Sequence, residues 1–465
     1  MSSAIQEARE DVIQAGKQLV KKGLIARTWG NVSCRISASE FVITPSGIGY
    51  ENLKPEEIVI VNIEDCGYTG DVEPSSEKGV HAEVYKQRPD VNFVIHTHQP
   101  CASAVSTLKT NIDIAAINPD LRHLIGDQVI YVPYGLPGST QLRKNVATAL
   151  AHSGSKAYLL ASHGTLCLGA DCDEAFRVAL AMEELCTLFI EERYCQLSGR
   201  SAKDYDHLRD YFVKSQTGGL ERSGESVKII EAFEVDKEDE TEETDPMVVR
   251  LSQSGQRRRA SQHLQYLFSS ERVGNYFKLY LDAGEDEPFP QVSDNIFEVN
   301  LEKGNSAISD SSTCFEKKQI LAVEIHRAVY NSFENVNIIR HTISPDIRAV
   351  SKAGKDIYPL LDDCAQIIGP SVKVADLAAD RPEKLARVVV ENLQGRSALL
   401  IKNNGALCCG PNKSDAEAAA MVLDKNCKAI IAAALFGQVE PIAPEECALL
   451  RNIYLEDYSK KAERK

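Results

Sequence analysis

The sequence lacks any run of about 18 consecutive apolar residues, the length that a membrane-spanning helix requires. No apolar segment typical of a signal peptide follows Met1, so we expect a cytoplasmic protein without a membrane partner. Positive charge is scarce: 52 Lys and Arg residues stand against 67 Asp and Glu residues, which gives a net charge of −15. This balance argues against nucleic acid as a partner, because binding to the phosphate backbone requires a cationic surface.

Regularly spaced cysteines are absent as well. The thirteen cysteines include no C-x-x-C pair, and two of them, Cys408 and Cys409, are adjacent. Disulfide frameworks and zinc knuckles both depend on regular cysteine spacing. We therefore predict reduced thiols and assign them no chemistry.

Apolar residues make up 43% of the 465 positions, enough for two or three folded domains. Helical patterns alternate with short β-like runs over residues 1–222, which predicts one α/β domain there. The run EVDKEDETEETD at residues 234–245 is dominated by acidic side chains, and we predict an acidic linker over residues 223–256. The expected helices cover residues 4–23, 76–88 and 172–194, and the expected strands include SCRIS, FVITPSG, EIVIVNIE and VNFVIHTH.

The chain repeats itself beyond the linker. VNFVIHTHQPCASAVS (residues 91–106) aligns without gaps with VNIIRHTISPDIRAVS (residues 336–351), and eight of the sixteen positions are identical. AYLLASHGTLCLG (residues 157–169) aligns in the same way with ALLIKNNGALCCG (residues 398–410). We therefore predict a second copy of the domain over residues 257–465, with remodelled first strands because residues 257–305 match poorly.

Two histidines stand one residue apart in the stretch VIHTHQP. Because residues i and i+2 of a strand point to the same face, His96 and His98 should present two imidazoles side by side. His163, in an SHG turn between two predicted strands, can supply a third nitrogen. Three imidazoles with one open position are typical of a catalytic zinc site, although H-x-H alone also fits histidines that bind no metal.

Three short stretches are rich in small polar residues: TWGNVS (residues 28–33), TPSG (residues 44–47) and PSSE (residues 74–77). Each places hydroxyls, a side-chain amide or backbone N–H groups in a turn, an arrangement that suits a phosphate group. Taken singly, each stretch also fits an ordinary turn or helix cap.

In this order, the motifs resemble those of the class II aldolase/adducin family, whose enzymes include L-fuculose-1-phosphate aldolase. The resemblance covers nearly all of the first copy and, more weakly, the second. It implies an α/β protein with two copies of a three-layer α/β/α fold, each with a mostly antiparallel central sheet flanked by helices. It also implies that a divalent metal, Zn²⁺ or alternatively Mn²⁺ or Co²⁺, is bound by His96, His98 and His163, and that the substrate phosphate is bound by Asn31, Ser46, Gly47, Ser75 and Ser76.

Glu77 corresponds to the acid/base carboxylate of the family's aldolases, whereas the epimerases carry aspartate there. The resemblance thus implies a metal-dependent aldolase that cleaves a ketose 1-phosphate to dihydroxyacetone phosphate and an aldehyde. A carboxylate beside the metal can transfer the proton, provided that burial brings its pKa toward neutrality. The alternative for Glu77 is a residue that only stabilises the first turn of a helix, and for His81 a buried structural histidine.

Pro119 departs from the family pattern, because fuculose-phosphate aldolases place a tyrosine of the neighbouring subunit in the segment that corresponds to IAAINPDLRH. Proline cannot donate a proton. Either the donor is one of the nearby residues Asp120, His123, Tyr131 and Tyr134, or the reaction differs. A dehydratase or decarboxylase of a related sugar phosphate is therefore an alternative, and so is a non-catalytic scaffold like adducin.

In the second copy, the aligned register replaces His98 by Ile343, His163 by Asn404 and Glu77 by Ala322, while Ser75 and Ser76 become Ile320 and Leu321. We predict a folded but catalytically silent domain in which His341 is a remnant packed within its strand. Family enzymes assemble as fourfold rings, so we expect a homo-oligomer. In it, two chains with two fused domains each would close a pseudo-tetrameric ring. The silent copy would then bring Asp362, Asp363, Tyr454 or Tyr458 toward an active site.

Overall fold

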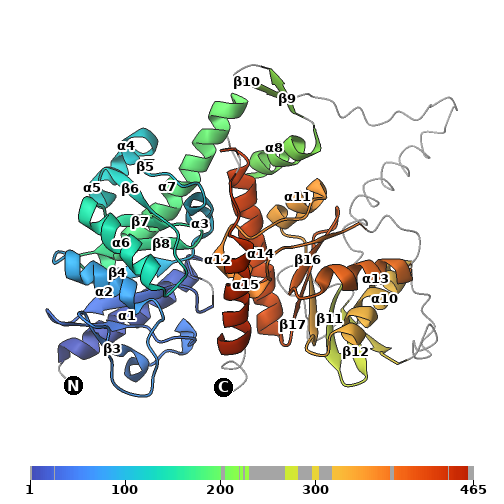
Figure 1. Cartoon of the computed structure of the whole chain (residues 1–465), viewed down its shortest axis with the longest axis horizontal. Coiled ribbons are helices and arrows are strands. Elements are labelled where there is room, and N and C mark those ends of the chain that lie inside the picture. The colour runs from blue at the N-terminus through green and yellow to red at the C-terminus, as the bar shows by residue number, and fades with distance from the viewer. Residues whose placement is uncertain are drawn as a thin grey trace, which may run out of the picture. The chain divides into compact units, whose positions relative to one another are not determined.

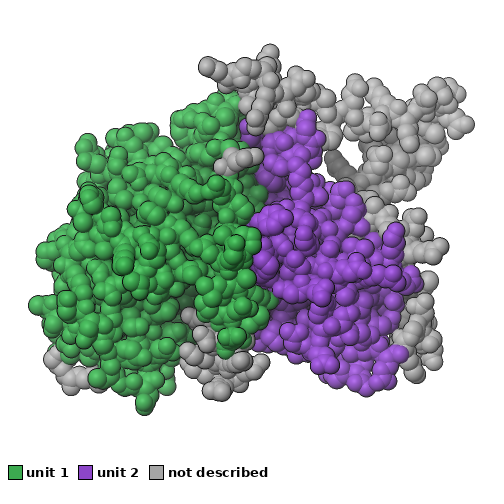
Figure 2. Space-filling model, viewed as in Figure 1, with its two compact units in different colours: residues 1–202, 359–366, 428–465 green, residues 203–358, 367–427 purple. Residues whose placement is uncertain are grey.

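The computed structural model describes residues 3–25, 27–200, 205–218, 220–223, 226–229, 268–280, 296–302, 317–376, 382–437 and 439–458. The acidic run at residues 234–245 lies outside the described residues. Two compact units are distinguished in Figure 2: unit 1 comprises residues 1–202, 359–366 and 428–465, and unit 2 comprises residues 203–358 and 367–427. The domain boundaries drawn from the sequence stay predictions.

An eight-stranded sheet forms the centre of unit 1, with the strand order β3-β2-β1-β4-β8-β7-β6-β5 (Figure 1). Neighbouring strands are antiparallel except β6 and β7, which are parallel. The strands are β1 (Asn31–Arg35), β2 (Glu40–Ile43), β3 (Val59–Asn62), β4 (Phe93–Thr97), β5 (Ile112–Asp113), β6 (Gln128–Val132), β7 (Ala157–Leu160) and β8 (Gly164–Gly169).

Helices flank this sheet and complete a three-layer α/β/α arrangement. Helices α2 and α6 pack against each other and share a core with the sheet, while α1, α3 and α7 contact β1, β4 and β8. The helices are α1 (Ser3–Lys21), α2 (Lys78–Gln87), α3 (Pro100–Ser106), α4 (Ile114–Ile117), α5 (Arg122–Ile125), α6 (Thr140–His152), α7 (Cys172–Ser198) and α15 (Pro444–Ile453), with shorter turns η1 (Tyr50–Asn52), η2 (Pro55–Glu57), η3 (Pro119–Leu121) and η4 (Tyr454–Tyr458).

The predicted elements of the first copy are confirmed at nearly every position. The opening amphipathic helix buries Val12, Ile13 and Leu19, and Gly23 follows it with φ of +70°, the left-handed conformation expected after a helix. Helix α7 begins at the Asp171 cap, whose side chain accepts a hydrogen bond from the backbone N–H of Glu174. Local patterns therefore placed these elements, whereas α3 to α6, β5 and β6 were not predicted from the sequence.

Unit 2 contains a seven-stranded sheet with the order β13-β12-β11-β14-β17-β16-β15, which repeats the order β3-β2-β1-β4-β8-β7-β6 of unit 1. The parallel pair recurs at the same place, between β15 and β16. The expected remodelling of the first strands does not extend to their order, although their sequences match poorly. The strands are β11 (Ser269–Val273), β12 (Tyr276–Tyr280), β13 (Ile296–Asn300), β14 (Ile338–Thr342), β15 (Val374–Ala375), β16 (Ala398–Ile401) and β17 (Ala406–Gly410).

The remaining elements belong to unit 2, except α12, which lies in unit 1 up to Gln366, and the end of α14 from Lys428 on. Helices α10 and α13 pack against each other in a core with the strands of unit 2, as α2 and α6 do in unit 1. These elements are α8 (Tyr205–Thr217), β9 (Leu220–Ser223), β10 (Ser226–Ile229), α10 (Lys317–Ser332), α11 (Pro345–Ala353), α12 (Asp362–Ile367), α13 (Pro382–Leu393) and α14 (Lys413–Ala433).

Among the described residues, no helix is both long enough and apolar enough to span a membrane. Every cysteine of the described residues is a free thiol, as the irregular spacing predicted.

A buried Ser–His–Tyr cluster connects β1 to α2 in the first copy. The hydroxyl oxygen of Ser33 lies 2.6 Å from His81 Nδ1 and 2.7 Å from the Tyr85 hydroxyl. Burial lowers the pKa of His81 to about 3, so its imidazole is neutral. Such a histidine packs within the core and is fully hydrogen-bonded.

The same cluster recurs in the second copy. Ser270 Oγ lies 2.7 Å from His326 Nδ1 and 2.7 Å from the Tyr330 hydroxyl. Because the second copy carries Ala322 at the position of Glu77, a cluster common to both copies serves the fold rather than the chemistry. The structural interpretation of His81 is thereby favoured.

Acid should destabilise unit 2 through His326. Burial and, to a smaller extent, His341 lower the pKa of His326 from 6.5 to about 3. The native state therefore keeps the imidazole neutral while the unfolded chain protonates it, so this stability is fully present above pH 6.5 and is lost as the pH falls toward 3. Urea unfolding at pH 7, 5 and 4 should show a weaker pH dependence for His326→Gln than for the unsubstituted protein. His152→Gln, an exposed histidine, is the control, and equal pH dependence in all three proteins would contradict the prediction.

Candidate functional site

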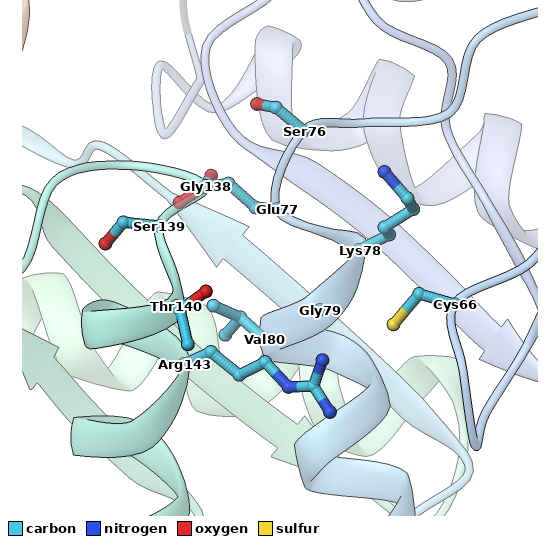
Figure 3. A pocket seen from close by; sticks show the side chains of 10 residues that line it. All are labelled: Cys66, Ser76, Glu77, Lys78, Gly79, Val80, Gly138, Ser139, Thr140 and Arg143. Carbon is cyan, nitrogen blue, oxygen red and sulfur yellow. The ribbon is translucent and has the colours of Figure 1, made fainter.

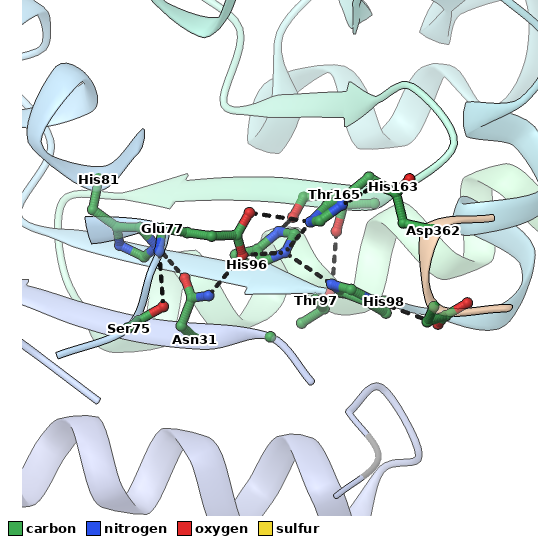
Figure 4. Close-up of polar contacts among 12 residues, drawn as sticks. Asn31, Ser75, Glu77, His81, His96, Thr97, His98, His163, Thr165 and Asp362 are labelled. Atoms are coloured by element: carbon green, nitrogen blue, oxygen red, sulfur yellow. Dashed lines mark hydrogen bonds and ion pairs between the residues drawn. The ribbon is translucent and has the colours of Figure 1, made fainter. Parts of the chain in front are cut away.

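Strands β4 and β8 bring the three candidate ligands together (Figure 4). His96 lies on β4 opposite Leu166, His98 follows the end of the strand, and His163 lies in the turn before β8. A Cβ atom at Gly164 would lie 2.2 Å from the carbonyl oxygen of Thr97 and 3.3 Å from His98 Cδ2. Only glycine therefore allows the two strand ends to approach this closely.

The three imidazoles converge through their Nε2 atoms. His96 Nε2 lies 3.0 Å from His98 Nε2 and 3.0 Å from His163 Nε2. One ligand atom from each histidine lies within 4.8 Å of the others. Within the described residues, no second group of three histidine, cysteine or carboxylate side chains converges in this way.

The opposite ring nitrogens of two histidines are engaged in hydrogen bonds. His96 Nδ1 donates to the carbonyl oxygen of Thr165 at 2.7 Å, and His163 Nδ1 donates to Asp362 Oδ2 at 2.8 Å. A neutral imidazole that donates through Nδ1 leaves the Nε2 lone pair available. Converging lone pairs on buried imidazoles fit a divalent cation, and the structure thus supplies a donor set that suits a metal.

Glu77 adds a carboxylate to this donor set. Its Oε2 lies 3.1 Å from His96 Nε2, its Oε1 lies 3.2 Å from His163 Nε2, and the residue is 7% exposed. Burial acts to raise the pKa of Glu77, but His96 and His163 outweigh it and hold the pKa well below its ordinary value. The expected rise toward neutrality is not found, because the imidazoles act in the opposite direction. Glu77 is therefore ionised, the form that accepts a proton.

His163 shows the reciprocal effect. Burial lowers its pKa, yet Glu77 and Asp362 outweigh burial and raise the pKa to about 10. His163 therefore carries a proton in the absence of a metal, and a cation bound through Nε2 would displace that proton. Glu77 and Asp362 also place negative charge beside the imidazoles. A cation placed there is stabilised by the same carboxylates.

Asn31 connects Glu77 to His81 of the buried Ser–His–Tyr cluster. Its Nδ2 donates a hydrogen bond to Glu77 Oε2 at 2.9 Å, and its Oδ1 accepts one from His81 Nε2. In the second copy, His326 Nε2 finds no hydrogen-bond partner among the described residues. The part of the network that reaches a carboxylate is thus restricted to the first copy.

The TPSG and PSSE stretches lie side by side. Pro45 pairs with Pro74, the backbone N–H of Ser46 donates to the carbonyl oxygen of Glu73 at 2.9 Å, and the N–H of Ser75 donates to Thr44 at 3.0 Å. Gly47 has φ of +73° and faces open space where a Cβ would lie. The sequence-predicted phosphate residues of these two stretches therefore occupy one place, at the start of α2.

A pocket opens at the beginnings of α2 and α6 (Figure 3). It contains two of the predicted site residues, Ser76 and Glu77, but most of its lining was missed in the sequence. Arg143 projects from α6 and binds Glu83 Oε1 at 2.7 Å. The only sequence signal was the GLPGST turn before that helix, which by itself indicates a helix cap. The lining residues are Cys66, Ser76, Glu77, Lys78, Gly79, Val80, Gly138, Ser139, Thr140 and Arg143.

Of the residues considered in place of the family tyrosine, Tyr134 is joined to the site. Its hydroxyl donates to Asp362 Oδ1 at 2.8 Å, and burial together with Asp362 raises the pKa of Tyr134. Pro119 lies on the 3₁₀ turn η3, and His123 Nδ1 donates to the carbonyl oxygen of Asp120. Tyr134 is therefore protonated and held by a carboxylate that also binds His163.

Two of the four second-copy residues expected near an active site are found there, both within unit 1. Asp362 binds His163, and Asp363 Oδ2 lies 3.6 Å from His98 Nδ1. The ring of Tyr454 lies under the guanidinium of Arg451, with 5.9 Å between Cζ and the ring centroid, and the Tyr458 side chain lies outside the described residues.

The second copy retains no comparable donor set among the described residues. His341 Nε2 donates a hydrogen bond to the backbone carbonyl of Asn404 at 2.8 Å. Ala322 is fully buried in the core of unit 2. His341, the one histidine that the alignment retains at a candidate-ligand position, thus hydrogen-bonds a backbone carbonyl, and its interpretation as a remnant stays a prediction.

Comparison with known proteins also finds two copies of one domain in this chain. The family model described as "Class II Aldolase and Adducin N-terminal domain" matches residues 10–190 and 291–431. The 5-deoxy-D-ribulose 1-phosphate aldolase of Bacillus thuringiensis serovar kurstaki is 31% identical over 193 residues, which are 41% of this chain and 87% of the relative. The L-fuculose phosphate aldolase of Escherichia coli O6:H1 is 35% identical over 179 residues, 38% of this chain and 80% of the relative.

Solved structures with similarity to this chain include an L-fuculose 1-phosphate aldolase at 28% identity, which covers 42% of this chain and 88% of that one with a TM-score of 0.38. Another is the L-fuculose-1-phosphate aldolase from Thermus thermophilus, at 26% identity, 41% and 95% coverage and a TM-score of 0.36.

Proposed function

Because this chain belongs to the class II aldolase and adducin N-terminal domain family, with the domain matched twice, we propose that it is a metal-dependent sugar-phosphate aldolase. Its reaction would cleave a ketose 1-phosphate to dihydroxyacetone phosphate and an aldehyde. The observation that carries the proposal is the convergence of three imidazole Nε2 atoms and the Glu77 carboxylate in the first copy.

In this proposal, His96, His98 and His163 hold the divalent cation, with Zn²⁺ as the first choice and Mn²⁺ or Co²⁺ as alternatives. When bound, the cation supplies Lewis-acid stabilisation of the negative charge that develops on the substrate oxygens. The Nδ1 hydrogen bonds of His96 and His163 orient the two rings before substrate arrives.

Glu77 transfers the proton in this reaction. Cleavage of the C3–C4 bond releases a proton from the C4 hydroxyl and requires one at C3 of the product. Glu77 is ionised and buried, and Asn31 fixes one of its oxygens, so the carboxylate is oriented to accept and return a proton. Tyr134 is the candidate for a second proton-transfer group, since its hydroxyl is joined to the site through Asp362.

We assign the substrate phosphate to Ser46, Gly47, Ser75 and Ser76, with Asn31 contributing the second hydrogen of the Nδ2 group that also donates to Glu77. The pairing of Pro45 with Pro74 supports this, because it places two hydroxyl-rich turns together next to Glu77. Backbone N–H groups and hydroxyls of this kind bind phosphate without a cationic cluster.

Two other functions are distinguished by specific observations. The exposed Pro119 in place of a tyrosine favours a dehydratase or decarboxylase of a related sugar phosphate as the second candidate. The silent second copy favours an adducin-like scaffold. The intact ligand set in the first copy argues against it, because a scaffold needs no such set. A cytoplasmic homo-oligomer, with two chains closing a ring of four domains, remains our expectation for the assembly.

The proposed reaction is tested by incubating the Zn²⁺-loaded protein with a panel of 1-phosphoketoses and the matching unphosphorylated ketoses. We expect dihydroxyacetone phosphate, detected with a coupled glycerol-phosphate dehydrogenase, only from the phosphorylated sugars. Turnover that yields a dehydrated or decarboxylated sugar instead would assign the second candidate. A protein that binds metal but consumes no sugar phosphate would contradict the enzymatic proposal.

A further inference from the structure

The carboxylate of Asp362 is built into the metal-ligand cluster of the first copy. Its Oδ2 accepts the Nδ1 hydrogen of His163 at 2.8 Å and its Oδ1 accepts the Tyr134 hydroxyl at 2.8 Å. Its backbone N–H donates to the carbonyl oxygen of Ser162 at 2.9 Å. Asp362 is 1% exposed, so these contacts replace water at the carboxylate.

The turn at Ser162 and His163, to which the Asp362 backbone is hydrogen-bonded, is itself strained. Ser162 has φ of +56°, a left-handed conformation that is uncommon for a residue other than glycine. The residue that follows it is His163, the ligand whose ring Asp362 contacts. Hydrogen bonds from Asp362 to both the turn and the ring therefore hold His163 in one position.

Asp362 does not belong to the domain copy that provides the histidines. It lies within the second match to the family model, residues 291–431, whereas His163 lies within the first, residues 10–190. The segment Pro359–Gln366 nevertheless belongs to unit 1. Its Ala365 packs in the same apolar cluster as Tyr134.

We propose that Asp362, a residue of the second copy, is a positioning residue for the metal site of the first: it fixes the Nδ1–H tautomer and the ring orientation of His163, so that Nε2 faces the cation. This rests on the metal site of the proposed function. It assigns a role to the second copy, which lost its own ligands but supplies the segment that completes the first copy's site.

The test measures metal affinity in the full-length protein. Metal-free protein is titrated with Co²⁺, followed by its visible absorption, and with Zn²⁺ in competition with a chromophoric chelator. Loss of an outer partner of a ligating histidine weakens metal affinity by about 10–100-fold, and we expect this loss in Asp362→Ala and a smaller one in Asp362→Asn, which keeps the shape of the side chain. The Co²⁺ absorption band should also shift in both variants.

Asp346→Asn is the matched control. Asp346 is a buried carboxylate, 3% exposed, that binds Arg209 within unit 2. The Asp346→Asn variant should lower the unfolding temperature of the metal-free protein without changing metal affinity. The Asp362→Asn variant should weaken metal affinity by more than its change in unfolding temperature accounts for. If Asp362→Ala does not fold, Asp362→Asn decides.

Unchanged Co²⁺ and Zn²⁺ affinity in the Asp362 variants, with normal binding by the unsubstituted protein, would overturn the inference and leave the proposed function intact. Absence of binding by the unsubstituted protein would overturn both. The two failures are therefore distinguished in one experiment.

Discussion

Glu77→Gln is expected to lower kcat by about 10²–10⁴-fold, the range for removal of a positioned acid or base. Glutamine keeps the size of the side chain and can still accept the hydrogen bond from Asn31 Nδ2, but it cannot accept a proton. We expect KM to change little, because the residues assigned to the phosphate remain. Steady-state kinetics of dihydroxyacetone phosphate release on the best substrate of the panel measures both constants.

Metal content separates this effect from damage to the ligand set. The Glu77→Gln protein should retain about the same Zn²⁺ stoichiometry as the unsubstituted protein, since the three histidines are unchanged. Glu174→Gln is a suitable control, because Glu174 is paired with Lys156 outside the site. A Glu77→Gln protein with near-normal kcat would assign the proton transfer to another group, and Tyr134→Phe would be the next variant to examine.

His98→Ala is expected to weaken metal binding by at least about 100-fold, beyond the effect of losing an outer partner, and to abolish activity with it. His98 lies beyond the end of β4, and its Nε2 is 3.0 Å from His96 Nε2, so its removal deletes a ligand atom without interrupting the strand. Elemental analysis after dialysis and Zn²⁺ competition with a chelator give the stoichiometry and the affinity.

The second copy provides the comparison for this variant. His341 occupies the position of His96 in the aligned strand but donates its Nε2 hydrogen to a backbone carbonyl. His341→Ala should therefore leave both metal content and kcat unchanged. Equal metal loss in His98→Ala and His341→Ala would indicate a nonspecific effect on folding, and metal retention in His98→Ala would contradict the assignment of the three histidines.

Much of the first copy could be predicted from local patterns. A strand alternates its side chains between two faces, so the H-x-H spacing was enough to place His96 and His98 together. The SHG turn between two predicted strands made His163 a candidate third ligand, but His163 lies beside the other two because β8 pairs with β4, a contact between distant segments. The duplication also followed from the sequence, and the strand order of the second sheet confirms it.

Electrostatics could not be predicted in the same way. Burial alone would raise the pKa of Glu77, whereas the positions of two imidazoles within about 3 Å of its oxygens decide the opposite direction. Asn31 was assigned to phosphate from its place in a polar turn, yet its amide N–H is directed to Glu77. Distances between charged groups on separate elements depend on how those elements pack.

The sequence by itself determined the two copies, the absence from the second copy of histidines at the positions of His98 and His163, and the choice of the three candidate ligands in the first. These features depend on residue type and on spacing within a strand or turn, which local backbone geometry dictates. Only the tertiary structure decided that Asp362 contacts His163, a residue 199 positions away. No periodicity links segments so far apart, and their contact is set by the packing of the whole chain.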